Sequence, residues 1–325
     1  MVLTGEGADE HFAGYIPFVT EFLREPDLAW PHGVLSNDKL RQGLLGREAA
    51  SQPWYASFSM NNGGAMDNII HRQLNNIELC SAFSIFRPPV AIFLSWVRSI
   101  YGDLDPSETA TNSVDGRIKE LIRKKWHPLH SALYVWTRTI LANNILSCLG
   151  DRVEMAHSVE ARTPFLDHHL TEYVNALPPS VKVRCAIDRA EAVNGSVGQG
   201  ESREITASES CSLTEKWILR EAARPFIPDE IYRRRKQPFF APATYPTGGP
   251  LHKLLQKTLT KENIDQLGFL DWNVVESQLK QAFPTDAEQS GGALTHTMRA
   301  LLMSAQLVIL GQRFGVKKAS PETRV

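Results

Sequence analysis

The 325-residue chain can bury one large hydrophobic core or two small ones, because 42% of its residues are hydrophobic and 22% are charged. Its formal net charge of −1 gives no overall field that would attract a nucleic acid or an anionic membrane, so we expect neither partner. The start has no signal-peptide pattern and no run of residues is apolar enough to span a bilayer, so we expect a cytoplasmic protein.

Most of the chain has the apolar spacing of helices. A short apolar run at residues 1–4 predicts one strand, and residues 181–183 are a second, weaker strand candidate. Helices are predicted over residues 68–82, 90–101, 115–125, 130–149, 167–177, 214–223 and from Gly291-Gly292 to about 314. Residues 185–212 are polar and without periodicity, which predicts an irregular, flexible insertion in a single mainly helical domain over residues 1–325.

The four cysteines, Cys80, Cys148, Cys185 and Cys211, are widely separated and include no C-x-x-C pair. This spacing favours neither a zinc site nor a disulfide framework. We therefore expect buried or inert thiols in a reducing compartment.

The opening segment, T-G-E-G-A-D-E-H-F-A-G-Y over residues 4–15, combines glycines with three carboxylates where a strand leads into a helix. Glycines let backbone amides approach a ligand, and a helix amino terminus favours anions. Carboxylates beside a phosphate require magnesium between them, or one of them acts as a base. The alternative is a tight turn whose acids complement the helix dipole, and spacing alone leaves both open.

Three blocks resemble motifs of the asparagine synthase family. The opening segment resembles S-G-E-G-x-D-E-x-F-G-G-Y, with Thr4 for the serine and Ala13 for a glycine. Residues 155–167 resemble M-A-x-x-V-E-x-R-x-P-F-L-D, and residues 214–239 contain its K-x-x-L-R and R-K-x-x-F elements. The three blocks occur in the same order as in the family, so the chain as a whole resembles a member of the asparagine synthase family.

The resemblance implies a fold and a reaction. The fold would be the carboxy-terminal portion of a PP-loop (adenine nucleotide alpha hydrolase-like) α/β synthetase domain, mainly α because most of the parallel sheet is missing. In this family ATP activates a carboxylate as an acyl-adenylate, and an amine then displaces AMP. The expected cofactors are ATP and Mg²⁺. The substrates would be a small carboxylate, aspartate or a metabolite acid, with ammonia or another amine.

The resemblance also assigns roles. The glutamate matching Glu6 lies near the reacting acyl centre, where it could take a proton from the amine. Asp9 matches an aspartate that helps to hold magnesium at the pyrophosphate, and Thr4 and Gly5 match positions that line the nucleotide site. Lys236 matches a lysine that stabilises charge on pyrophosphate and on the acyl-transfer transition state.

Two of these motifs have plainer interpretations. Lys236 closes the basic run 233–235, which could be a solvated helix end. Glu160 and Arg162 could form a substrate loop, or could bind each other as a buried ion pair that locks the loop. Residues 164–167 are expected to provide packing and a helix start.

The resemblance places the PP-loop, and a glutaminase half with a nucleophilic cysteine, upstream of the matching segment. Val2 stands in the position of that cysteine. The chain alone is therefore expected to bind ATP weakly or not at all. A preceding segment or a partner chain would supply these parts. The rival hypothesis is a repurposed, non-catalytic interaction or scaffold protein.

Overall fold

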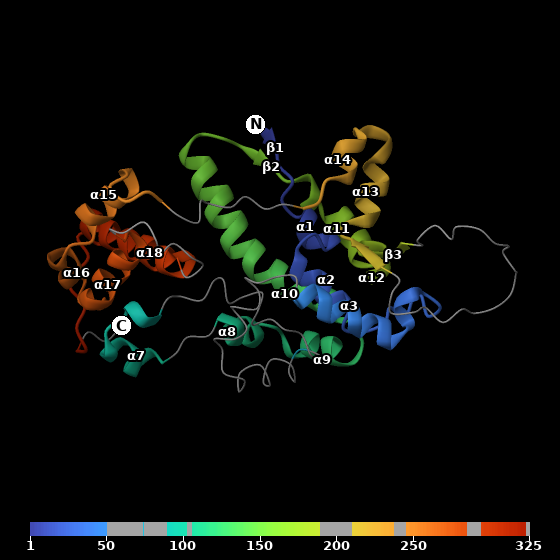
Figure 1. Cartoon of the computed structure of the whole chain (residues 1–325), viewed down its shortest axis with the longest axis horizontal. Coiled ribbons are helices and arrows are strands. Elements are labelled where there is room, and N and C mark those ends of the chain that lie inside the picture. The colour runs from blue at the N-terminus through green and yellow to red at the C-terminus, as the bar shows by residue number, and fades with distance from the viewer. Residues whose placement is uncertain are drawn as a thin grey trace, which may run out of the picture. The chain divides into compact units, whose positions relative to one another are not determined.

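The computed structural model describes residues 1–50, 74, 90–102, 106–188, 210–236, 245–284 and 294–322. Two compact units form: Met1–Ile85 with Pro106–Lys236, and Phe86–Asp105 with Gln237–Val325 (Figure 1). The prediction of a mainly helical chain is confirmed for the described residues, in which only two small sheets occur. The single domain over residues 1–325 and the PP-loop assignment stay predictions.

The first unit opens with strand β1 (Val2–Leu3), as predicted, and β1 pairs in parallel with β2 (Ala161–Arg162). The Val2 amide donates to the Glu160 carbonyl at 2.9 Å, and the Thr4 amide donates to the Arg162 carbonyl at the same distance. Figure 1 shows the two strands side by side near the amino terminus. The sequence did not reveal β2 because two residues are too few to show an alternating pattern.

Helices α1 (Ala8–Phe12) and α2 (Ile16–Phe22) follow β1, and α10 (Pro128–Trp136) packs against α2. The rings of Tyr15, Phe18 and Trp136 meet there, with centroid separations of 5.4 to 5.7 Å. Offset and edge-to-face aromatic pairs of this kind add stability beyond the area they bury. This aromatic cluster supports the segment that carries the opening motif.

The predicted helix over residues 130–149 is part of a longer one. α10 continues without a break into the π-helix η4 (Thr137–Glu154). The early part lies in the core, where Val135 and Leu141 are buried, but Leu149 is exposed. The helix therefore starts in the core and ends outside it.

Two predicted helix starts are confirmed by their caps. Asp115 accepts a hydrogen bond from the Arg117 amide at the start of α9 (Gly116–Lys124). Asp167 accepts from the amides of His169 and Leu170 at the start of α11 (His168–Asn175). An aspartate at this position satisfies amides that have no partner within the helix. The described part of the first unit also contains η1 (Val34–Ser36), α3 (Asp38–Ala50), α8 (Pro106–Asn112) and η5 (Pro164–Leu166).

The predictions for residues 181–183 and 185–212 need correction. Helix α12 (Pro179–Lys182) occupies most of the expected weak strand. Both ends of the polar stretch are strands, β3 (Arg184–Asp188) and β4 (Ser210–Thr214), which pair antiparallel. Residues 189–209 lie outside the described residues. These segments form strands despite their polar residues, because β3 and β4 supply each other's backbone hydrogen-bond partners over five paired positions.

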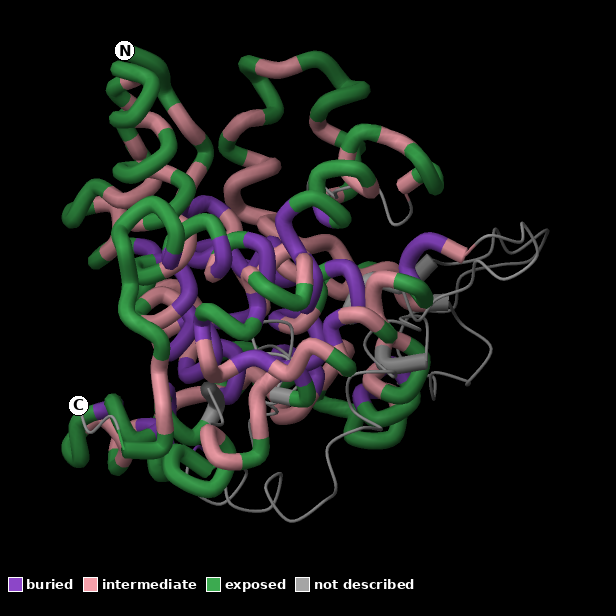
Figure 2. The backbone as a smooth tube through the Cα atoms, turned by 90° about the vertical axis from the view of Figure 1, so that its left-hand side faces the viewer, coloured by how far each residue is buried: buried purple, intermediate pink, exposed green. Residues whose placement is uncertain are grey.

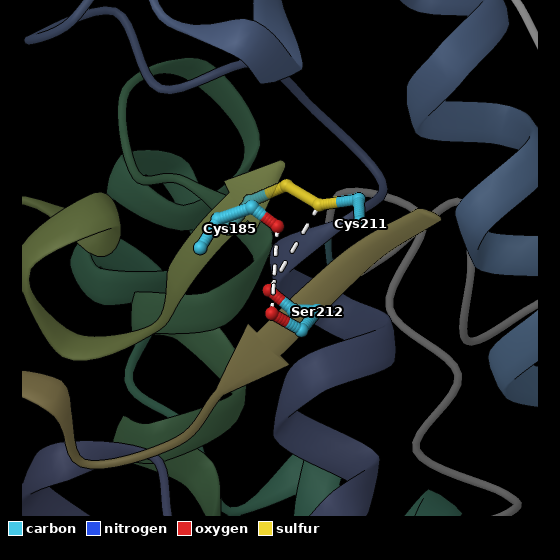
Figure 3. Close-up of a disulfide and its surroundings, with 4 residues drawn as sticks. Cys185, Cys211 and Ser212 are labelled. Atoms are coloured by element: carbon cyan, nitrogen blue, oxygen red, sulfur yellow. Dashed lines mark hydrogen bonds between the residues drawn. A yellow bond between two sulfur atoms is a disulfide. The ribbon is translucent and has the colours of Figure 1, made fainter. Parts of the chain in front are cut away.

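The prediction of no disulfide is also wrong. Cys185 on β3 and Cys211 on β4 form a disulfide, with Cα atoms 6.2 Å apart (Figure 3). In the strand register Cys185 pairs with Leu213, which makes Cys211 its diagonal neighbour. Cys148 is an exposed free thiol rather than a buried one, and Cys80 lies outside the described residues. Spacing along the chain contained no information on this register.

The first unit ends with α13 (Trp217–Ala223), η6 (Arg224–Phe226) and α14 (Asp229–Arg233). The predicted helix over 214–223 is confirmed from Trp217, while Thr214 belongs to β4. The Arg184 guanidinium lies 4.5 Å from the ring centroid of Trp217 and so links α13 to β3. After α14, residues 234–236 have no regular secondary structure.

The second unit packs short helices around a long one. It contains η3 (Val90–Ile92), α7 (Ser95–Tyr101), α15 (Pro250–Thr258), α16 (Lys261–Leu267), α17 (Trp272–Ala282) and α18 (Leu294–Phe314). The predicted final helix is confirmed as α18. The helix predicted over 90–101 is interrupted at Phe93, which forms a β-bridge with Leu270. The helix predicted over 68–82 lies outside the described residues, apart from Leu74.

Buried and exposed stretches alternate along the backbone (Figure 2). Within α18 the burial pattern is the one expected for an amphipathic helix. Leu301 is fully buried in the core of the second unit, whereas Leu310 is 51% exposed. No helix in the described part of the chain has both the length and the apolar character needed to cross a membrane.

Replacing Leu301 by alanine is expected to lower the free energy of unfolding by about 2–5 kcal/mol, because it leaves a cavity in a close-packed core. The matched control is Leu310→Ala on the same helix, which should cost far less. Urea unfolding of both variants is the measurement. Equal losses for the two would contradict the assigned orientation of α18.

Candidate active site

The turn from β1 into α1 requires glycine at position 7. Gly7 has a φ of 92°, a conformation that residues with a side chain rarely adopt. A Cβ atom there would lie 2.3 Å from a methyl carbon of Leu166. Gly7 therefore lets the opening segment and residues 164–166 pack closely, and the ring of Phe12 meets that of Phe165 edge to face.

A second glycine makes room for the Asp9 carboxylate. A Cβ atom on Gly14 would lie 1.9 Å from Asp9 Oδ1, so any side chain at position 14 would displace that oxygen. Ala13, the substitute for a motif glycine, is buried and has a φ of 59°. The backbone thus keeps the left-handed conformation that the motif glycine would favour, at some cost in strain.

Asp9 is the centre of a charged cluster. Its Oδ1 lies 2.8 Å from Lys216 Nζ, and its Oδ2 lies 2.8 Å from Lys236 Nζ. The Asp9 side chain is only 13% exposed, so this double ion pair is largely shielded from water. Lys236 therefore meets the opening segment, although more than 200 residues separate them.

Lys216 was not among the site residues predicted from the sequence. It is the lysine of the K-x-x-L-R element, so a signal was available. Its φ of 53° places it in the left-handed conformation between β4 and α13, which is uncommon for a residue with a long side chain. Such strain often occurs at functional positions, where surrounding contacts hold it.

Lys236 also contacts the aromatic ring of Tyr15 in the opening segment, and Glu10 in turn holds Tyr15. The Lys236 Nζ lies 5.4 Å from the ring centroid of Tyr15, within cation–π distance. The Tyr15 hydroxyl donates to Glu10 Oε1 at 2.9 Å. Glu10 is buried, and burial raises its pKa. Of the three carboxylates in the motif, Glu10 therefore supports Tyr15 from inside the unit.

Glu6 is half-buried and electrostatically coupled to the cluster. Burial raises the pKa of its carboxyl, the charge of Asp9 raises it further, and Lys236 lowers it. Glu154, at the end of η4, also raises it. A raised pKa makes a carboxyl a stronger base, which suits a group that accepts and returns a proton.

The comparison with known families identifies the chain as a whole. A family model described as asparagine synthase matches residues 1–308. The chain belongs to the asparagine synthase family.

Two relatives are 38% identical to the chain over 319 residues: the amidase chyE of Penicillium rubens and the amidase chry2 of Gibberella zeae. Each comparison covers 98% of this chain but 42% of the relative, so the chain spans less than half the length of these relatives. Asparagine synthetase (glutamine-hydrolyzing) 3 of Bacillus subtilis is 33% identical over 89 residues, which are 27% of this chain and 10% of that protein. No solved structure gave a significant match.

In this member of the asparagine synthase family, Thr4 and Gly5 lie between strand β1 and the glutamate of the opening motif. The Thr4 hydroxyl is buried and has no hydrogen-bond partner in the described part of the chain. A Cβ atom on Gly5 would meet nothing within 4 Å. A buried hydroxyl without a partner is compatible with a ligand group, and the nucleotide role of Thr4 and Gly5 stays a prediction.

Glu160 and Arg162 form an ion pair, but not a buried one. Their side chains are 49% and 64% exposed, so the prediction of a buried pair that locks the loop is wrong. The loop is held by its backbone instead, through the pairing of β2 with β1. Their role as a substrate loop stays a prediction, as do the roles of Glu6, Asp9 and Lys236.

Proposed function

We propose that this chain is the synthetase-side portion of an enzyme that activates a carboxylate with ATP and transfers an amine to it. The observation that supports this most directly is the double ion pair of Asp9 with Lys216 and Lys236. Two ammonium groups converge there from distant parts of the chain, beside a half-buried Glu6. Such a cluster suits a reaction that releases pyrophosphate, whose charge the two lysines would neutralise.

Each residue has a proposed task. Lys216 and Lys236 leave Asp9 to bind the phosphates of the nucleotide, and Lys236 remains on the pyrophosphate as it departs. Glu6 accepts a proton from the attacking amine, for which its raised pKa is suitable. Thr4 and Gly5 border the nucleotide.

Magnesium fits this proposal only together with phosphate. Among the described residues, no group of three or more histidine, cysteine or acidic side chains could hold a metal ion. Asp9 is a suitable single ligand, because Mg²⁺ in nucleotide sites binds one or two carboxylates plus substrate phosphates. When bound, the ion would neutralise phosphate charge.

The substrate is proposed to be an acid other than aspartate. Relatives that match 98% of the chain carry the name amidase, whereas the synthetase of Bacillus subtilis matches 27% of it. Those names also suggest a second candidate, the hydrolysis of an amide without ATP. We favour synthesis because the cluster holds two cations on a largely shielded carboxylate, which suit phosphate release better than water attack.

The complete enzyme would need the segments that the chain does not share with its longer relatives. We propose that a preceding segment or a partner chain supplies the PP-loop and a source of ammonia. The uncovered part of the Penicillium rubens relative is available as a substitute.

Pyrophosphate binding tests the proposed site on the 325-residue chain itself. Isothermal titration with magnesium pyrophosphate should detect binding that Lys216→Ala and Lys236→Ala each weaken about tenfold or more. Lys280→Ala, which removes an exposed lysine paired with Glu276, is the matched control and should have no effect. Unchanged binding in both site variants would contradict the proposal.

The same chain fused to the uncovered part of that relative tests the reaction. Exchange of labelled pyrophosphate into ATP should depend on a carboxylic acid from a panel that includes aspartate. Release of ammonia from amides without ATP would instead support hydrolysis. Absence of both, with pyrophosphate binding also absent, would support the scaffold hypothesis.

A further inference from the structure

A second ion pair, Glu215–Arg220, makes hydrogen bonds to the backbone of both lysines. Arg220 donates through Nη2 to Glu215 Oε1 and through Nε to the Glu215 carbonyl, the latter at 2.9 Å. The two side chains are 15% and 14% exposed. Glu215 precedes Lys216 in the chain, and the Arg220 amide donates to the Lys216 carbonyl at 2.9 Å. The pair therefore fixes the start of α13, where Lys216 adopts its left-handed conformation.

The same pair also holds the segment that leads to Lys236. Arg220 Nη1 donates to the carbonyls of Tyr232 at 2.7 Å and Arg234 at 2.8 Å. Glu215 Oε1 accepts from the amide of Lys236 at 3.0 Å. Residues 234–236 have no regular secondary structure, so these bonds take the place of a helix or sheet in setting their position.

The packing of α14 on α13 does not depend on this pair alone. The Tyr232 hydroxyl donates to Glu221, and the Arg224 guanidinium lies 5.0 Å from the Tyr232 ring centroid. These contacts end at Tyr232, before the irregular segment begins. What Arg220 and Glu215 add is contact with Arg234 and Lys236, the residues beyond the helix.

We infer that Glu215 and Arg220 are positioning residues that set both lysines against Asp9, an inference that rests on the proposed function for its catalytic meaning. One guanidinium serves four acceptors at fixed angles, which a lysine ammonium cannot do. The Glu215 carboxylate joins the two halves, because its backbone leads to Lys216 and its oxygen binds the amide of Lys236. This role would explain why the K-x-x-L-R element carries an arginine at its last position.

Lysine acetylation tests the positioning without requiring any enzyme activity. The intact 325-residue chain is treated briefly with N-hydroxysuccinimidyl acetate, and modification at each lysine is measured by mass spectrometry. In wild type, Lys236 should react slowly, because it is paired with Asp9 and only 24% exposed. Arg220→Lys should raise its rate roughly tenfold, as expected for losing hydrogen bonds to a charged group. Glu215→Gln should raise it less, because the amide oxygen still accepts from Lys236.

Internal references separate this effect from unfolding. Lys182 is fully buried and reports opening of the whole first unit, while Lys280 is exposed and reports reagent strength. Asp229→Asn breaks the exposed ion pair with Arg233 in α14 and should leave Lys236 unchanged. If Arg220→Lys also exposes Lys182, the milder Glu215→Gln decides. No rise at Lys236 in a folded variant, or a rise only together with Lys182 in both, would overturn the inference.

Activity of the fused enzyme then separates the two proposals. Arg220→Lys should lower kcat while leaving KM for the acid largely unchanged, as expected when a transition-state contact is misplaced. Faster labelling of Lys236 in Arg220→Lys, combined with no pyrophosphate exchange by the wild-type fused enzyme, would support the positioning and refute the proposed function. Loss of exchange in Arg220→Lys without faster labelling of Lys236 would support the proposed function and refute the positioning.

Discussion

Replacing Lys236 by alanine in the fused enzyme should lower turnover roughly 100-fold or more, with substrate binding less affected. The reason is that its charge matters most as pyrophosphate departs, and loss of one preorganised electrostatic contact typically has an effect of this size. Steady-state kinetics of amide formation is the measurement. Lys280→Ala serves again as the control, since its ammonium pairs with an exposed Glu276 on α17.

Glu6→Gln should have a different signature in the same enzyme. Pyrophosphate exchange would persist while amide formation falls, because Glu6 is proposed to act after adenylation, on the amine. Equal losses of exchange and amide formation in Glu6→Gln and Lys236→Ala would refute this division of roles, although family membership would stand. Wild-type rates in both variants would mean that this cluster is not catalytic.

The second large expected effect is on the pH dependence of the free energy of unfolding, and it comes from Lys182. Lys182 is fully buried, and its Nζ donates to the His11 carbonyl at 3.0 Å, at the end of the helix that carries Asp9. Burial lowers the pKa of Lys182 to about 8, from an ordinary 10.5. Between these values the unfolded chain binds more protons than the folded chain, so raising the pH favours folding. Lys182 alone should therefore add roughly 3 kcal/mol to the free energy of unfolding between pH 8 and 10.5.

Urea unfolding at several pH values compares the wild type with Lys182→Met, which lacks the titrating group. The stability of the wild type relative to the variant should rise over this window, and below pH 8 the difference should be constant. Lys261→Met, at an exposed lysine, is the control and should show no such trend. A pH-independent difference between wild type and Lys182→Met would show that Lys182 titrates normally in the folded chain.

Features that depend on neighbours a few residues away could be predicted from the sequence. The caps Asp115 and Asp167 follow from residues within one turn, and the final helix follows from its apolar spacing. The apolar run at residues 2–3 indicated a strand, which its pairing with β2 completes. The family and its motif also came from the sequence, and with them Glu6, Asp9 and Lys236 as candidates.

Features that join distant segments depended on the tertiary structure. The pairing of β3 with β4 decided that Cys185 and Cys211 meet, and β2 exists only because β1 lies beside it. The exposure of the Glu160–Arg162 pair follows from the surroundings of β2, which no local pattern records.

The candidate site shows the same division. The sequence determined the glycines at 7 and 14 on either side of α1, because only glycine tolerates the conformation at one and the nearby carboxylate at the other. Only the tertiary structure brought Lys216 and Lys236 to opposite oxygens of one aspartate more than 200 residues away. Capping and turn energies act within three or four residues, whereas the distance between two such ammonium groups is set by the packing of every element between them.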